Sequence, residues 1–82
     1  SENIQDVKNA ILGSEDIQGN LLDKVKEFAT KYGISSEDIK NLTIANLLME
    51  LKQKTNDPEE NNLFTNLFNL AKGLGLSDKK LK

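Results

Sequence analysis

The side chains that most often carry catalysis are missing from this chain, since its 82 residues include neither histidine nor cysteine. Those two residue types supply the commonest general base, the commonest thiol nucleophile and most ligands for transition metals. Carboxylates remain, and they form neighbouring pairs at residues 15–16, 37–38 and 59–60. Neighbours on a helix diverge by about 100°, so such a pair does not form one shared acid–base or metal site. The sequence therefore predicts a protein that is not an enzyme, with no catalytic residue, metal ion or cofactor.

A short glycine pattern, Gly73-Leu74-Gly75, has the G-x-G spacing found in some loops that bind a small molecule. A dinucleotide-binding loop of this kind follows a β-strand, whereas this one follows a helical pattern. We therefore expect a helix-ending turn and no small-molecule substrate.

Residues 25–42, VKEFATKYGISSEDIKNL, resemble the helix-turn-helix of DNA-binding proteins. Ala29 is the small residue of the first helix, Gly33 lies in the turn, and Ile39 and Leu42 are the aliphatic residues of the second helix. Small Ala29 lets the two helices approach, and Ile39 and Leu42 pack back onto the first helix. Any helical hairpin with a glycine turn can produce the same spacing.

If the resemblance extends to function, the second helix would read DNA with Ser35, Ser36, Lys40 and Asn41. The first turn of a recognition helix faces bases and phosphates, yet residues 37–38 place two carboxylates there. All 11 basic residues of the chain are lysine and the net charge is −2. Arginine supplies the bidentate contacts to guanine and phosphate, so nucleic-acid binding is the alternative and not the leading interpretation.

Helical periodicity runs through the first half of the chain. Residues 3–12 carry apolar side chains at the spacing of one helical face, and so do residues 21–32. Asn20 is the expected N-cap of the second helix. Gly13 and Gly33 are expected to end these two helices in a left-handed conformation that costs glycine nothing.

Residues 35–54 carry two apolar faces instead of one. Met49 shares a face with residues 39, 42 and 45, while Ile44 belongs to an opposed face with residues 47, 48 and 51. A straight helix of this kind would have to be buried on both sides. We favour a bend near residues 41–43 with Thr43 capping a second helix, because Thr and Asn cap helices well and extend them poorly. A continuous helix is the alternative.

The clearest helix start is Asp57-Pro58, with Asp57 as the N-cap, Pro58 in the first turn and Glu60 completing a capping box. The helix should run to Lys72, with Gly73 at its end. Its apolar arc spans about 160°, wider than the ~100° that one core contact requires. The residues predicted to bind a partner along this arc are Leu63, Phe64, Leu67, Phe68 and Leu74. The alternative is a central core helix with nothing left exposed.

These elements predict an all-α fold: a compact bundle of four to five short helices in one domain over residues 1–82. Ser77 could cap a truncated helix, or residues 77–82 could be a frayed basic tail. The predicted core is Ile4, Val7, Ile11, Leu22, Val25, Phe28, Ala29, Ile39, Leu42, Leu48, Leu67, Phe68 and Ala71.

With catalysis set aside, the leading hypothesis is a non-catalytic protein-interaction module, such as a small adaptor, regulator or docking domain. It would bind another protein or a second copy of itself through apolar helix faces. The alternative is a helix-turn-helix DNA-binding regulator using residues 25–42. No apolar run reaches the ~18 residues of a membrane span, and the polar start is unlike a signal peptide. We therefore expect a cytoplasmic protein with no membrane partner.

Overall fold

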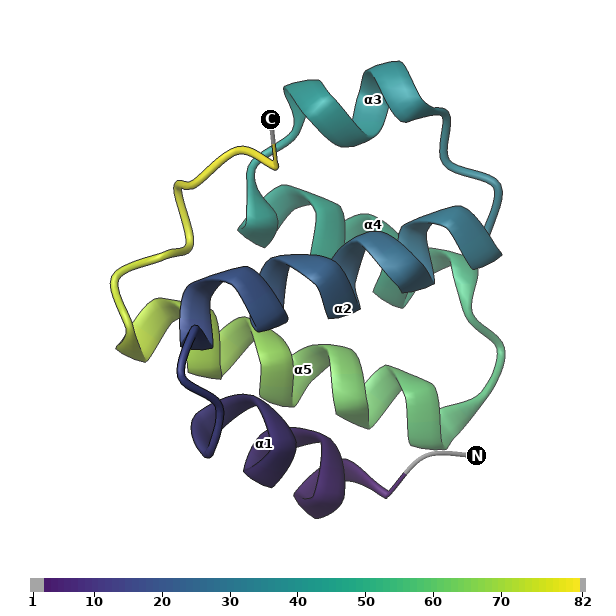
Figure 1. Cartoon of the computed structure of the whole chain (residues 1–82). Coiled ribbons are helices and arrows are strands. Elements are labelled where there is room, and N and C mark those ends of the chain that lie inside the picture. Colours follow the sequence, from purple (N-terminus) through teal and green to yellow (C-terminus); the bar gives the residue numbers. More distant parts are fainter. Residues whose placement is uncertain (1–2, 82) are drawn as a thin grey trace.

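The computed structural model describes residues 3–81, and these form five helices. The helices are α1 (Ile4–Leu12), α2 (Ile17–Lys31), α3 (Ser36–Asn41), α4 (Ile44–Lys54) and α5 (Pro58–Gly73). Figure 1 shows them packed into one all-α bundle, with a non-helical segment after α5 that returns towards α3. The predicted fold class is confirmed.

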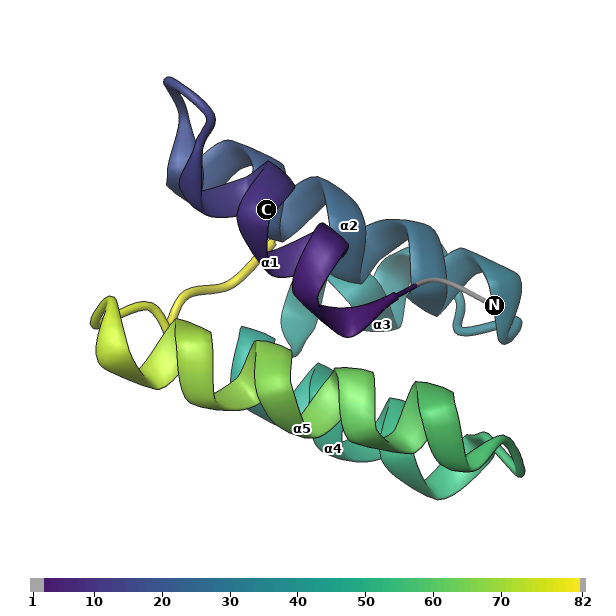
Figure 2. The same cartoon turned by 90° about the horizontal axis from the view of Figure 1, so that it is seen from below.

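Two layers make up the bundle. Figure 2 shows α4 and α5 side by side in one layer and α2 in the other, and α1 lies across the edge between α2 and α5. The α4–α5 pair is the most extensive helix contact, as expected for helices joined by a short connection. The face of the α4–α5 pair that points towards α2 is therefore covered, and the opposite face of the pair is not.

Each helix begins at a side chain that accepts a backbone N–H. Asn3, Ser35, Thr43 and Asp57 act as N-caps of α1, α3, α4 and α5. The expected N-cap of α2 was wrong, because α2 begins four residues earlier, at Ile17. The Asp16 carboxylate accepts from the Gly19 N–H at 2.9 Å and so places Gly19-Asn20 inside the helix.

The glycine predictions were partly right. Gly33 has φ 73° and ends α2 in the expected left-handed conformation. Gly13 has φ −83°, so the left-handed cap predicted for α1 was wrong. The left-handed residue after α5 is Gly75, with φ 72°, while Gly73 is still helical.

The predicted bend is confirmed, since α3 ends at Asn41 and Thr43 caps α4 by accepting from the Asn46 N–H at 3.1 Å. The C-terminal segment differs from both expectations. It is neither a helical turn nor a frayed tail: the Ser77 carbonyl accepts from the Ala45 N–H at 3.0 Å, and the Lys79 carbonyl accepts from the Ile44 N–H at 2.7 Å. These bonds occupy N–H groups that the first turn of a helix leaves without partners. Lys82 of the predicted tail lies outside the described residues.

The core is larger than predicted. Most of the predicted residues are buried, but four of them are only partly buried: Ile4, Leu22, Leu42 and Phe68. The prediction missed eight residues that are buried: Leu21, Ile34, Ile44, Leu47, Leu51, Leu63, Phe64 and Leu76. Over residues 3–81, no helix has both the length and the apolar character to cross a membrane.

Candidate protein-binding surface

Three of the five residues predicted to bind a partner are not on the surface. Leu63, Phe64 and Leu67 are at most 2% exposed, so the prediction that this edge of α5 is free was wrong. The Phe64 ring packs edge-on against Phe28 at 5.0 Å and Tyr32 at 6.4 Å between ring centroids. The wide apolar arc is needed because α5 is covered by α2 and α1 as well as by α4.

The other two predicted residues keep exposed surface. Leu74 is 39% exposed just beyond the end of α5. Phe68 is half-buried and lies in a groove between α4 and α5 with a volume of about 330 Å³. This α4–α5 groove is lined by Met49, Lys52, Gln53, Thr65 and Phe68.

Helix geometry explains why these side chains meet. On α5, Asn61, Thr65 and Phe68 recur every three or four residues and so follow one edge of the helix. On α4, Met49 and Lys52 do the same. The Asn61 side-chain amide donates to the Lys52 carbonyl at 3.4 Å, so these two residues lie opposite each other on the two helices.

The α4–α5 groove is mostly apolar in character. Met49 is 51% exposed, the highest value among the large apolar residues of the described chain. The Thr65 hydroxyl donates to the Asn61 carbonyl at 3.1 Å, so its one hydrogen-bond donor is already used. A ligand in this groove would therefore gain mainly from burying Met49 and Phe68.

Sequence reasoning missed Met49 as a site residue, although the signal was present. Met49 is out of phase with the apolar face of Ile44, Leu47, Leu48 and Leu51, which the structure buries completely. Once the bend separates α3 from α4, a second face on α4 no longer has a core to enter. An apolar residue left on that face is a candidate for an intermolecular contact.

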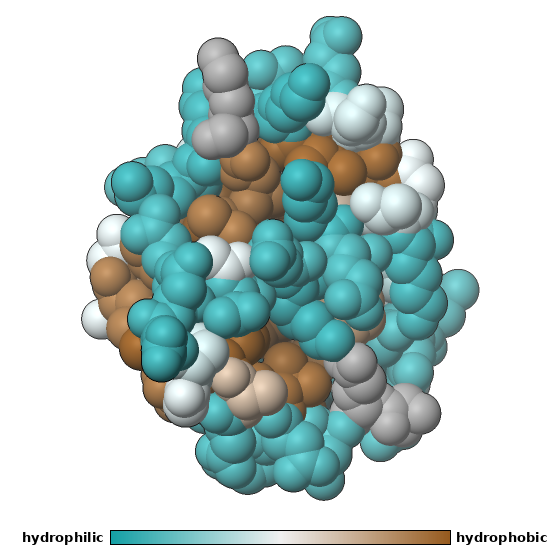
Figure 3. All heavy atoms as spheres, in the orientation of Figure 1, coloured by the Kyte–Doolittle hydropathy of each residue, from teal (hydrophilic) through white to brown (hydrophobic). Residues whose placement is uncertain are grey.

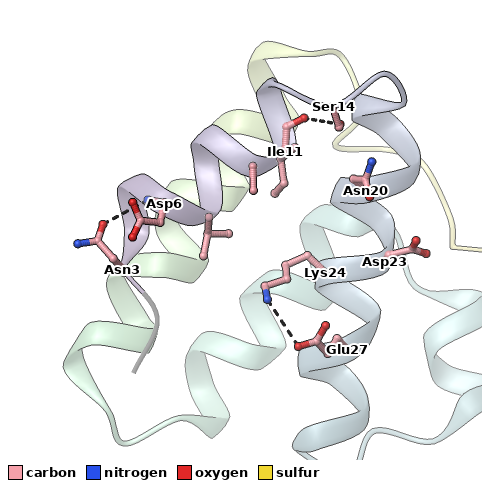
Figure 4. Close-up of a pocket in the computed structure, with 10 residues that line it drawn as sticks. Asn3, Asp6, Ile11, Ser14, Asn20, Asp23, Lys24 and Glu27 are labelled. Carbon is pink, nitrogen blue, oxygen red and sulfur yellow. Dashed lines mark hydrogen bonds and ion pairs between the residues drawn. The ribbon is translucent and has the colours of Figure 1, made fainter.

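A second groove lies between α1 and α2, with a volume of about 510 Å³ (Figure 4). Asp6, Asp23 and Glu27 are on its rim, and Lys24 forms an ion pair with Glu27 at 3.5 Å. The apolar residues beneath, Val7 and Ile11, are 8% and 4% exposed. This groove is larger than the α4–α5 groove, but its lining is more polar and carries three carboxylates, so it is the weaker candidate for an apolar ligand.

A polar cluster joins the end of α2 to the start of α5. The Glu60 carboxylate accepts hydrogen bonds from the hydroxyls of Tyr32 and Thr55 and from the Lys31 ammonium, the last at 2.5 Å. The predicted capping box was wrong, because Glu60 turns to these partners instead of back to Asp57; the Asp57 N–H donates to the Thr55 hydroxyl. Each side chain of the cluster is hydrogen-bonded to another member. The cluster therefore links α2 to α5 and offers no open binding site.

The electrostatics of this cluster follow from its geometry. Burial alone would raise the pKa of the Glu60 carboxyl, but the hydrogen bonds from Lys31, Tyr32 and Thr55 outweigh it and lower that pKa below its usual value. The hydrogen bond to Glu60 correspondingly raises the pKa of the Lys31 ammonium. Glu60 and Lys31 therefore form a charged pair at neutral pH.

The residues named for the DNA-binding alternative, Ser35, Ser36, Lys40 and Asn41, are all exposed on or beside α3. The hairpin has the expected form, with Ala29 and Ile39 buried and Gly33 in the turn. However, α3 has only 6 residues, and the Ser35 hydroxyl is used to cap it. DNA binding by this hairpin stays an alternative.

Within residues 3–81, no cluster of three or more His, Cys, Asp or Glu side chains is arranged to hold a metal ion. Comparison of the chain with models of protein families, with curated proteins and with solved structures found no match.

Proposed function

We propose that this protein is a non-catalytic interaction module that binds a helical segment of another protein in the α4–α5 groove. The observation that carries the proposal is the position of Met49, an exposed apolar side chain beside the half-buried Phe68 in a concave site. Binding of the apolar face of an amphipathic helix in a hydrophobic groove is a recurring mode of peptide recognition. A cytoplasmic location is part of the same proposal.

The chemistry of Met49 supports a peptide ligand. Methionine is unbranched and polarisable, so it adapts to different partners and is common at surfaces that bind peptides. Figure 3 shows polar side chains over most of the face formed by α2 and α5, with the apolar surface split into separate areas. The α4–α5 groove offers two apolar side chains, Met49 and Phe68, and so suits a partner that binds through a small number of anchoring side chains.

A selection experiment tests the proposal. The immobilised protein is screened against a displayed library of helical peptides, and the recovered peptides are measured against Met49→Asp by fluorescence anisotropy. Met49→Asp should weaken binding at least tenfold, because it places a charge in the centre of the groove. It should leave the fold intact, since Met49 is half exposed.

The matched control is Leu12→Asp, which also adds a charge at an exposed leucine, 44% exposed and outside the groove lining. It should bind the recovered peptides as the unmodified protein does. Circular dichroism and melting curves of both variants verify that they are folded. Peptides that bind the two variants equally well would refute the proposal.

A further inference from the structure

We infer that the segment recognised by the α4–α5 groove is an amphipathic helix that carries carboxylates at both ends of its apolar face. This inference rests on the proposed function and names the chemistry of the partner. Its basis is the distribution of charge along the groove.

One lysine, Lys52, lines the groove, and a second, Lys72, lies one helical turn beyond Phe68 on α5. Lys52 lines one end, where its backbone carbonyl contacts Asn61. Lys72 lies on the same edge of α5 as Phe68, four residues further on and exposed. None of the groove-lining residues in the described chain is acidic, although the protein has 13 Asp and Glu residues.

The spacing of these lysines sets the length of the partner. Lys72 follows Asn61 by eleven residues on α5, which corresponds to about 16 Å at 1.5 Å per residue. A partner helix lying along the groove covers that distance in about three turns. Its carboxylates should therefore be separated by roughly ten to eleven residues, with two or three apolar side chains between them that meet Met49 and Phe68.

The charge distribution argues against a second copy of this chain in the groove. A symmetric dimer pairs the same surface with itself, so the surface that carries Lys52 and Lys72 would meet an identical surface with the same two lysines. Like charges facing each other across an interface oppose association and exclude wrong partners. A helix with acidic ends, in contrast, gains attraction at both Lys52 and Lys72.

The test uses the peptides recovered from the helical library. The inference predicts that peptides whose binding requires Met49 are enriched in Asp and Glu at both ends of their apolar face. The double variant Lys52→Glu/Lys72→Glu should bind them about tenfold more weakly. Raising the salt concentration from about 0.05 to about 0.5 M should reduce the difference in affinity between the double variant and the unmodified protein, because screening weakens interactions between exposed charges.

The control is Lys26→Glu/Lys40→Glu, which makes the same change in net charge at exposed positions outside the groove. This control variant should lose little affinity for the recovered peptides. Both double variants should melt like the unmodified protein, since all four lysines are at least partly exposed.

The two proposals fail in different ways. If the recovered peptides require Met49 but show no acidic bias and bind Lys52→Glu/Lys72→Glu normally, the inference is wrong and the proposed function stands. If no recovered peptide requires Met49, both are wrong. If sedimentation shows that the protein self-associates and Met49→Asp abolishes it, the occupant is a second copy and the inference is again wrong.

Discussion

Phe64 should be among the most important side chains for stability, although the sequence suggested a role in binding. It is completely buried, and its ring contacts Phe28 and Tyr32 edge-on. Phe64→Ala removes these contacts and leaves a cavity between α2 and α5. Substitutions of this kind cost about 3–5 kcal/mol. A chain of 82 residues has a total stability of about 4–12 kcal/mol at 0.05–0.15 kcal/mol per residue.

Urea unfolding followed by circular dichroism measures this effect. Phe64→Ala should lower the free energy of unfolding by about 3–5 kcal/mol with little change in the m-value, or unfold the protein outright. Phe64→Leu keeps part of the volume and should lie in the usual range of about 0.5–3 kcal/mol, so that a value can still be measured.

The matched comparison is Phe68→Ala on the same helix. Phe68 is only partly buried at the rim of the α4–α5 groove, so we expect a loss of about 1 kcal/mol or less. The reverse order, with Phe68→Ala more damaging than Phe64→Ala, would mean that α5 is rotated about its axis and that the groove has been assigned to the wrong face.

Three further predictions follow from the caps and charges. Asp57→Ala should cost about 0.5–2 kcal/mol in urea unfolding, because its carboxylate accepts the Glu59 N–H at the start of α5. The lowered pKa of Glu60 stabilises the fold above the carboxyl's unfolded value, and this stabilisation is lost as pH falls through the folded pKa. Melting temperatures between pH 7 and pH 3 should therefore fall less steeply in Glu60→Gln, and parallel curves would contradict this. In anisotropy titrations at moderate salt, mixed duplex DNA should show no binding; salt-sensitive micromolar binding that Lys40→Glu abolishes would favour the DNA-binding alternative.

Local features of the fold could be predicted because they depend on neighbouring residues. The bend at residues 41–43 follows from Thr43 as a cap, and the start of α5 follows from Asp57-Pro58. The start of α2 was missed because the sequence offers two N-cap residues, Asp16 and Asn20. Asp16 is the N-cap in the structure, where its carboxylate accepts the Gly19 N–H. The roles of Glu60 and of the Lys79 carbonyl were missed because their partners are distant in the sequence.

The candidate site was harder to predict because a periodic pattern gives the width of an apolar face but not what covers it. The wide arc of α5 was assigned to a partner, whereas α2 and α1 cover most of it. Met49 was assigned to an apolar face, and the structure leaves that residue half exposed. Which of two apolar faces enters the core depends on how α4 and α5 pack, which the sequence pattern does not specify.

The most direct test of the central claim uses Met49 itself as the reporter, because it is the chain's single methionine. Protein labelled with ¹³C in the methionine methyl group gives one signal, from the α4–α5 groove. Adding a peptide recovered from the helical library should shift or broaden that signal in a saturable way, with the same affinity as measured by anisotropy. A peptide that binds while the Met49 methyl signal stays unchanged would show that the binding surface lies elsewhere.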